Sequence, residues 1–195
     1  MTNQSYDVRE RWAAADLIVL PGIGDSGREH WQSRWQERNP SMRRLQCADW
    51  DRPNLENWIS ALDRELAASK APPLLVAHSL GCLLVAHWAS TKSTAHVAGA
   101  FLVAVPDPNS AAFPAEARSF ANPPATRLPF PSLVVASTDD PYGSLGDTEI
   151  RAKHWGSGIV VAGALGHIND KSGIGDWPQG LALLRAFAAG ALPHG

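Results

Sequence analysis

Residues 74–89 read LLVAHSLGCLLVAHWA and join two apolar runs through a short polar turn. The first run, Leu74–Ala77, is continuously apolar, as expected of a strand that helices cover on both faces. The second run, Leu80–Ala89, is long enough to form a buried helix. Ser79 therefore lies in the turn from a buried strand to a helix, and this arrangement predicts an α/β domain.

The turn has small residues two positions before and two positions after Ser79, namely Ala77 and Gly81. Strand and helix pass close to each other at such a turn, so small side chains are needed there. The pattern A-x-S-x-G differs by one residue from the G-x-S-x-G of a nucleophile elbow, in which the serine is exposed at a helix N-terminus. A serine at this position is also a common helix cap, so the pattern alone leaves catalysis and capping open.

Similar apolar runs recur along the chain and predict further strands. The expected strands besides Leu74–Ala77 are Leu17–Leu20, Val97–Val105, Leu133–Ala136 and Ile159–Ala162, with a shorter candidate at Arg44–Ala48. The expected helices are one after Gly27 that carries Trp31 and Trp35, and those at Leu55–Ala68, Leu80–Ala89, Asp147–His154 and Pro178–Ala189. This alternation predicts a three-layer α/β fold with about six mostly parallel strands and helices on both faces.

Residues 106–131 interrupt the alternation, because they hold seven of the fifteen prolines. We expect a stiff loop or a short cap there and no long helix. The segment is either a surface connection or a lid over a site at the carboxyl ends of the strands. In the second case Phe113 and Phe120 would line the pocket, and the short chain leaves no room for a large cap domain.

A catalytic serine needs a base that takes its proton and an acid that orients the base. In a sheet of this kind the three residues follow in the order Ser, Asp, His, each after a later strand. Asp139 and Asp140 follow Leu133–Ala136, and His167 follows Ile159–Ala162. We therefore expect His167 to be the base, while the local sequence does not choose between the two aspartates as its acid.

The other histidines fit this role less well. His78 is adjacent to Ser79, so the two side chains point apart, and we expect His78 to pack or to support the site from behind. His87 lies in the expected helix, and His96, His154 and His194 lie outside the expected loops.

A second glycine-rich stretch, Gly22–Gly27, reads G-x-G-x-x-G and directly follows the strand Leu17–Leu20. This pattern is typical of a dinucleotide-binding turn, for which Asp49 would hold a ribose hydroxyl. It also suits an oxyanion loop, because both use backbone N–H groups that face an anion. Residues 28–32, REHWQ, favour the oxyanion loop, since a dinucleotide-binding helix buries small apolar residues after its glycines.

The length and composition predict one domain with a well-packed core. With 195 residues, of which 45% are hydrophobic, we expect a lead-in over residues 1–15 and one domain over residues 16–192. The net charge of −2 gives no electrostatic reason to expect nucleic acid or a membrane as partner. Cys47 and Cys82 are expected to be free thiols. We see no export signal and no apolar stretch of about 20 residues, so a cytoplasmic location is expected.

Four motifs together resemble the small serine hydrolases of the YdeN type, related to retinoblastoma-binding protein nine, within the α/β-hydrolase superfamily. They are LPGIGDSGREHWQSRW (residues 20–35), AHSLGC (77–82), STDDP (137–141) and GHINDKSGIGDWPQG (166–180). The first and last are long and specific to the family, and the resemblance covers most of the chain. Ala77 stands where the first glycine of the nucleophile elbow is usual, which is a mild departure from that motif.

The resemblance implies a hydrolase without a cofactor or metal that cleaves a small ester, thioester or amide. It assigns Ser79 as nucleophile, Asp140 as acid and His167 as base. It also makes Gly22–Gly27 the oxyanion loop, with the N–H groups of Ile23 and Leu80 as donors. Candidate pocket residues are Trp31, Tyr142 and Phe113. The alternative is a non-catalytic protein-binding module that keeps the fold.

Overall fold

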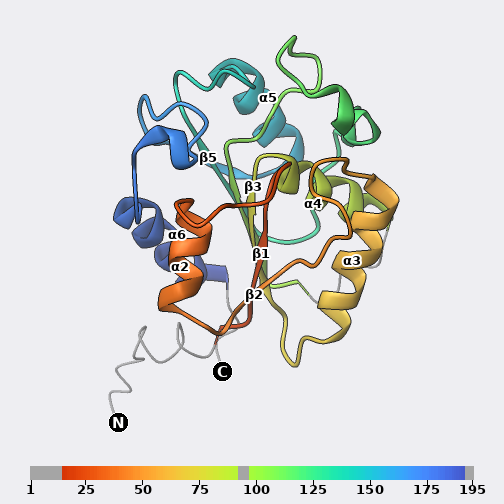
Figure 1. The fold of residues 1–195 in the computed structure, drawn as a ribbon, viewed down its shortest axis with the longest axis vertical. Coiled ribbons are helices and arrows are strands. Elements are labelled where there is room, and N and C mark those ends of the chain that lie inside the picture. Colours follow the sequence, from red (N-terminus) through yellow and green to blue (C-terminus); the bar gives the residue numbers. More distant parts are fainter. Residues whose placement is uncertain (1–14, 92–96, 192–195) are drawn as a thin grey trace.

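The computed structural model describes residues 15–91 and 97–191 of the chain. In this part, six parallel strands form one sheet in the order β2-β1-β3-β4-β5-β6 (Figure 1). The strands are β1 (Leu17–Leu20), β2 (Met42–Arg44), β3 (Leu74–His78), β4 (Gly99–Val103), β5 (Ser132–Ala136) and β6 (Gly158–Val161). The expected α/β fold with a parallel sheet of six strands is thus confirmed in the described residues.

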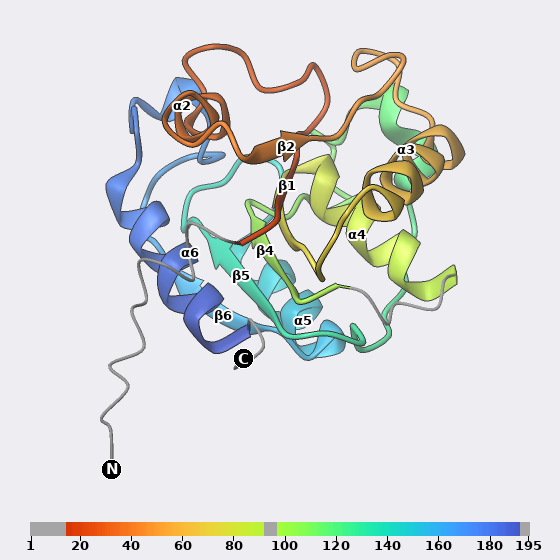
Figure 2. The same cartoon turned by 90° about the horizontal axis from the view of Figure 1, so that it is seen from below.

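Helices cover both faces of this sheet (Figure 2). The helices are α2 (Trp31–Arg38), α3 (Leu55–Ala67), α4 (Leu80–Thr91), α5 (Leu145–Trp155) and α6 (Pro178–Ala191). Helices α2 and α6 pack on one face, and α3, α4 and α5 pack on the other. All five lie where the sequence predicts them, with ends that differ by a few residues.

The alternation of side chains along each strand divides the core into two apolar layers. Along β1, Ile18 and Leu20 face α3 and α4, whereas Leu17 and Val19 face α2 and α6. All four of these side chains are fully buried. A strand that is apolar at every position is therefore explained by a helix layer on each side.

Two strand predictions need correction. The short strand is Met42–Arg44, two residues earlier than the expected Arg44–Ala48, because its pairing with β1 ends at Arg44. The expectation of a strand covered on both faces is wrong for β6, where Ile159 and Val161 are 38% and 46% exposed. This strand lies at the sheet edge, and α6 packs mainly against β4.

The proline-rich segment contains only a short 3₁₀ helix, Ala115–Phe120, and no long helix, as its prolines predict. It connects β4 to β5, and its first half reaches the edge of the sheet where the strands end. In the described part of the chain, no helix is both long and apolar enough to cross a membrane.

Candidate active site

Ser79 connects the end of β3 to the start of α4 with a backbone φ of 52°, which is unusual for any residue but glycine. Its N–H donates to the carbonyl of Val103 on the neighbouring strand, at 3.0 Å. Gly81 lies so close to β1 that a Cβ there would be 2.4 Å from the carbonyl oxygen of Leu20. The strained turn is therefore held by the packing of α4 against two strands.

Three side chains from separate loops form a continuous hydrogen-bonded row. His167 Nε2 lies 2.8 Å from Ser79 Oγ, and His167 Nδ1 lies 2.9 Å from both carboxylate oxygens of Asp140. The side chains of His167 and Asp140 are only 9% and 3% exposed. When Nδ1 donates its proton to Asp140, Nε2 is the acceptor for the Ser79 hydroxyl, which is the arrangement that activates a serine.

Asp139, the other candidate acid, contacts a different part of the same loop. Its Oδ1 accepts hydrogen bonds from the Ser137 hydroxyl at 2.7 Å and from the Gly166 N–H at 2.7 Å. These bonds, the Ser137 one first, lower the pKa of Asp139. The structure thus brings Asp140, and not Asp139, to the imidazole of His167.

His78 supports the site from behind, as expected from its position beside Ser79. Its ring is buried, and its Nε2 lies 2.9 Å from the backbone carbonyl oxygen of His167. Burial, followed by the proximity of His30 and His167, holds the pKa of His78 well below its usual value. A neutral His78 donates one N–H to that carbonyl.

The remaining histidines lie away from the row or outside the described residues. His87 on α4 bonds the carbonyl of Phe120, and His154 is an exposed residue of α5. His96 and His194 lie outside the described residues.

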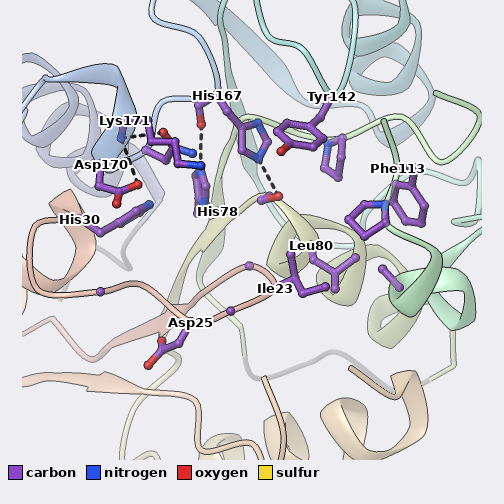
Figure 3. Close-up of a pocket in the computed structure, with 18 residues that line it drawn as sticks. Ile23, Asp25, His30, His78, Leu80, Phe113, Tyr142, His167, Asp170 and Lys171 are labelled. Carbon is purple, nitrogen blue, oxygen red and sulfur yellow. Dashed lines mark hydrogen bonds between the residues drawn. The ribbon is translucent and has the colours of Figure 1, made fainter. Parts of the chain in front are cut away.

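The loop Gly22–Gly27 lies directly against Ser79. A Cβ at Gly22 would be 2.9 Å from the Cβ of Ser79, so only glycine fits this approach. Ile23 and Leu80 both line the cavity in front of the serine, as the labels in Figure 3 show. Leu80 is the first residue of α4, so its N–H belongs to those that a helix leaves without an acceptor of its own.

The same loop lacks the geometry of a dinucleotide-binding turn. The following helix begins only at Trp31, with His30 as its cap, so the last glycine of the motif precedes the helix by a full turn. Asp49, the expected ribose ligand, instead binds the backbone and side chain of Arg52.

A cavity of about 380 Å³ opens in front of Ser79. Figure 3 shows charged and aromatic residues at different ends of it, on either side of His167. One end is polar, with His30, Asp170 and Lys171, whereas Phe113 and Tyr142 lie at the other. Pro106, Pro114 and Ala117 also line the cavity, and all three come from the proline-rich segment.

Two aromatic residues that were candidates for the pocket lie in the core. Trp31 is fully buried between Trp35 and Trp177, and its Nε1–H donates to the carbonyl of Ile168 at 2.8 Å. Phe120 is also fully buried and packs against Trp58. Neither residue lines the cavity, because each packs into one of the two apolar layers of the core.

The polar end of the cavity combines His30, whose position behind the glycine-rich loop is compatible with reaching the site, with Asp170 and Lys171, which were not predicted as site residues. His30 both lines this end and caps α2, since its Nδ1 accepts the N–H of Gln32. Burial lowers the pKa of His30 to about 4. Asp170 and Lys171 could have been predicted as site residues, because they follow His167 within the same short loop. Within residues 15–91 and 97–191, no three His, Cys, Asp or Glu residues gather as a metal site would require.

The chain is similar to known hydrolases in both sequence and fold. A family model described as "Serine hydrolase" matches residues 17–186. A YdeN-like hydrolase from Pectobacterium atrosepticum superposes with a TM-score of 0.85 at 32% identity, over 95% of this chain and 97% of that chain. A search of curated proteins finds no match.

Two more distant structures share the fold. The ydeN gene product of B. subtilis superposes with a TM-score of 0.75 at 19% identity, over 90% of this chain and 100% of that chain. Est1E from Butyrivibrio proteoclasticus, whose structure contains ferulic acid, has a TM-score of 0.64 at 13% identity, over 89% of this chain and 86% of that chain.

Proposed function

The chain belongs to the serine hydrolase family, and from this premise we propose that it cleaves a small ester, thioester or amide through an acyl-enzyme formed on Ser79. The observation that carries the proposal is the row of hydrogen bonds that joins Ser79, His167 and Asp140. A buried row of hydrogen bonds of this kind activates the serine as a nucleophile, because it moves a proton away from the serine hydroxyl.

In the proposed first half-reaction, Ser79 Oγ attacks the carbonyl carbon of the substrate while its proton passes to His167 Nε2. The carboxylate of Asp140 accepts a hydrogen bond from the Nδ1–H of His167, which orients the imidazole ring and stabilises the imidazolium that forms. The tetrahedral intermediate then collapses, the bond to the leaving group breaks, and the leaving group takes the proton from His167. The products of this step are the acyl-enzyme and the free alcohol, thiol or amine.

In the second half-reaction, water replaces the leaving group. His167 takes one proton from the water as its oxygen attacks the acyl carbon, and it returns that proton to Ser79 Oγ as the acid departs. The N–H groups of Ile23 and Leu80 are the proposed donors to the oxyanion in both steps. The close approach of Gly22 to Ser79 and the position of Leu80 at the helix start support this assignment.

The shape of the cavity supports a substrate with two unlike ends. Phe113 and Tyr142 offer an apolar wall on one side of the serine, and Asp170 and Lys171 offer opposite charges on the other. An ester with a short apolar chain and a small polar group matches both ends. The partner of this protein is accordingly proposed to be a small molecule.

The test is covalent labelling with a fluorophosphonate, read by intact mass. Wild type is expected to gain one adduct, and Ser79→Ala and His167→Ala are expected to gain none. Ser41→Ala and His154→Ala are the matched controls, because both residues are exposed and lie away from the cavity. Both controls should label at the wild-type rate.

Two outcomes would contradict the proposed function. Labelling that persists in Ser79→Ala would place the nucleophile elsewhere. A correctly folded wild type that is never labelled, and that hydrolyses no p-nitrophenyl ester, would favour the non-catalytic binding module over the enzyme.

A further inference from the structure

The loop that carries His167 is held at two successive N–H groups by side chains of the loop after β5. The N–H of Leu165 donates to Ser137 Oγ at 2.9 Å, and the N–H of Gly166 donates to Asp139 Oδ1 at 2.7 Å. Ser137 is buried and donates its own hydroxyl proton to the same Oδ1. Asp139 therefore closes a small ring of hydrogen bonds directly before the proposed base.

The two following carbonyl groups are held by side chains of other elements. His78 Nε2 bonds the carbonyl of His167 at 2.9 Å, and Trp31 Nε1 bonds the carbonyl of Ile168 at 2.8 Å. Both donors are buried and come from elements distant in the sequence, β3 and α2. Four consecutive residues, 165–168, thus each have one backbone group bound by a side chain from outside the loop.

This loop needs such support because its backbone is strained. Gly166 has a φ of 54°, which glycine adopts without strain, whereas Ile168 is held at a φ of 46°. Left-handed backbone is especially unfavourable for a β-branched residue such as Ile168. A conformation of this kind persists only where its surroundings hold it, so loss of one anchor is expected to let the loop relax.

We infer that Asp139 is a positioning residue that keeps the imidazole of His167 between Ser79 and Asp140. This inference rests on the proposed function. The two adjacent aspartates then have separate tasks, since Asp140 binds the ring while Asp139 binds the peptide that precedes it. Asp139 acts through hydrogen-bond geometry, because its carboxylate is exposed and water screens its charge.

The structure offers a matched pair of variants. Both hydrogen bonds to Asp139 end on the same oxygen, Oδ1, so the single amide oxygen of an asparagine can accept them both. Asp139→Asn removes the charge and keeps the acceptor, whereas Asp139→Ala removes both. The exposed position of Asp139 makes both variants compatible with folding.

The kinetic test measures kcat and KM for p-nitrophenyl butyrate, together with the rate of fluorophosphonate labelling. Asp139→Ala should lower kcat and the labelling rate by about 10- to 100-fold with little change in KM, because a small misplacement of the base slows proton transfer. Asp139→Asn should keep most of the wild-type kcat and labelling rate. An equal loss in both variants, or no loss in Asp139→Ala, would overturn the inference.

A second measurement does not depend on catalysis. Hydrogen exchange at the Gly166 amide, followed by NMR, should accelerate at least tenfold in Asp139→Ala and stay near the wild-type rate in Asp139→Asn. Equal protection in all three proteins would contradict a positioning role. If wild type is inert towards esters and fluorophosphonate, the proposed function fails, and the exchange rates still decide whether Asp139 holds the loop.

Discussion

Three histidine rings lie in a row beside the candidate nucleophile, but only one of them is placed to carry a proton. The centroids of His30 and His78 are 4.7 Å apart, and those of His78 and His167 are 4.9 Å apart. Burial lowers the pKa of His30 to about 4 and also depresses that of His78, so both stay neutral near pH 7. An imidazolium on His167 would therefore meet no positive neighbour in this row.

The buried state of His30 predicts a pH-dependent stability. Its folded pKa of about 4 lies below the ordinary histidine value of 6.5, so the unfolded chain binds the proton more readily and stability falls as pH drops from about 6.5 to 4. His30→Asn should reduce the loss of unfolding free energy between pH 7 and 4.5 by about 2 kcal/mol. Asparagine also keeps an acceptor for the cap of α2.

Urea titrations at both pH values measure this difference. His154→Asn, on the exposed surface of α5, is the matched substitution. If wild type and His30→Asn lose the same free energy on acidification, His30 is not neutral in the folded protein.

At the scale of the elements, the contact of α4 with β1 determines where Ser79 lies. The helix starts directly beneath the end of β1, and Gly81 is the residue that permits this distance. Its absent side chain leaves room for the carbonyl oxygens of Leu20 and Pro21. The glycine that the sequence motif requires is thus explained by one close contact between a helix and the neighbouring strand.

Gly81→Ala should destabilise the protein and disturb the serine. The added Cβ would lie 2.4 Å from the carbonyl oxygen of Leu20, so α4 must shift, at a cost of about 2 kcal/mol or more. Gly190→Ala is the control, because Gly190 lies in α6 and a Cβ added there would meet no neighbouring atom within 4 Å. Gly190→Ala should leave the free energy of unfolding unchanged or raise it by up to about 1 kcal/mol.

Thermal and urea unfolding of both variants, with fluorophosphonate labelling alongside, test the argument. Wild-type stability in Gly81→Ala would show that α4 and β1 can separate without cost.

At the scale of the whole molecule, the carboxyl ends of the parallel strands bring distant segments to one edge of the sheet. The loops after β1, β3, β4, β5 and β6 all contribute to the site. Helix α2 packs against the segment after His167 through ring contacts among Trp31, Trp35 and Trp177. The cavity is therefore a product of the complete sheet.

The apolar end of the cavity predicts a preference for acyl chains of moderate length. Phe113→Ala should raise KM for p-nitrophenyl hexanoate about tenfold and change KM for the acetate much less, because only the longer chain reaches the lost apolar surface. Phe113→Leu keeps most of that surface and is the control. Equal KM changes for both esters would place Phe113 outside the acyl site.

Much of this arrangement could be predicted from the sequence, because the signals are local. Continuous apolar runs predict the central strands, and the order Ser79, aspartate, His167 follows successive strand ends. The exposed face of β6 and the position of β2 could not be predicted, since they depend on where the sheet ends and which helix covers it. The cytoplasmic location, and the absence of nucleic acid or membrane partners, stay predictions.

The sequence by itself therefore determined the class of fold, the family and the candidate residues of the triad. The local residue pattern left Asp139 and Asp140 equivalent, the family resemblance favoured Asp140, and Trp31 and Phe120 were candidates for the pocket. The tertiary structure brought Asp140 to the ring of His167, and it alone showed that Asp139 binds the peptide before that ring and that both aromatic residues lie in the core. The physical reason is that strand and helix patterns are local, whereas the partner of a loop side chain depends on which distant loop meets it at the edge of the sheet.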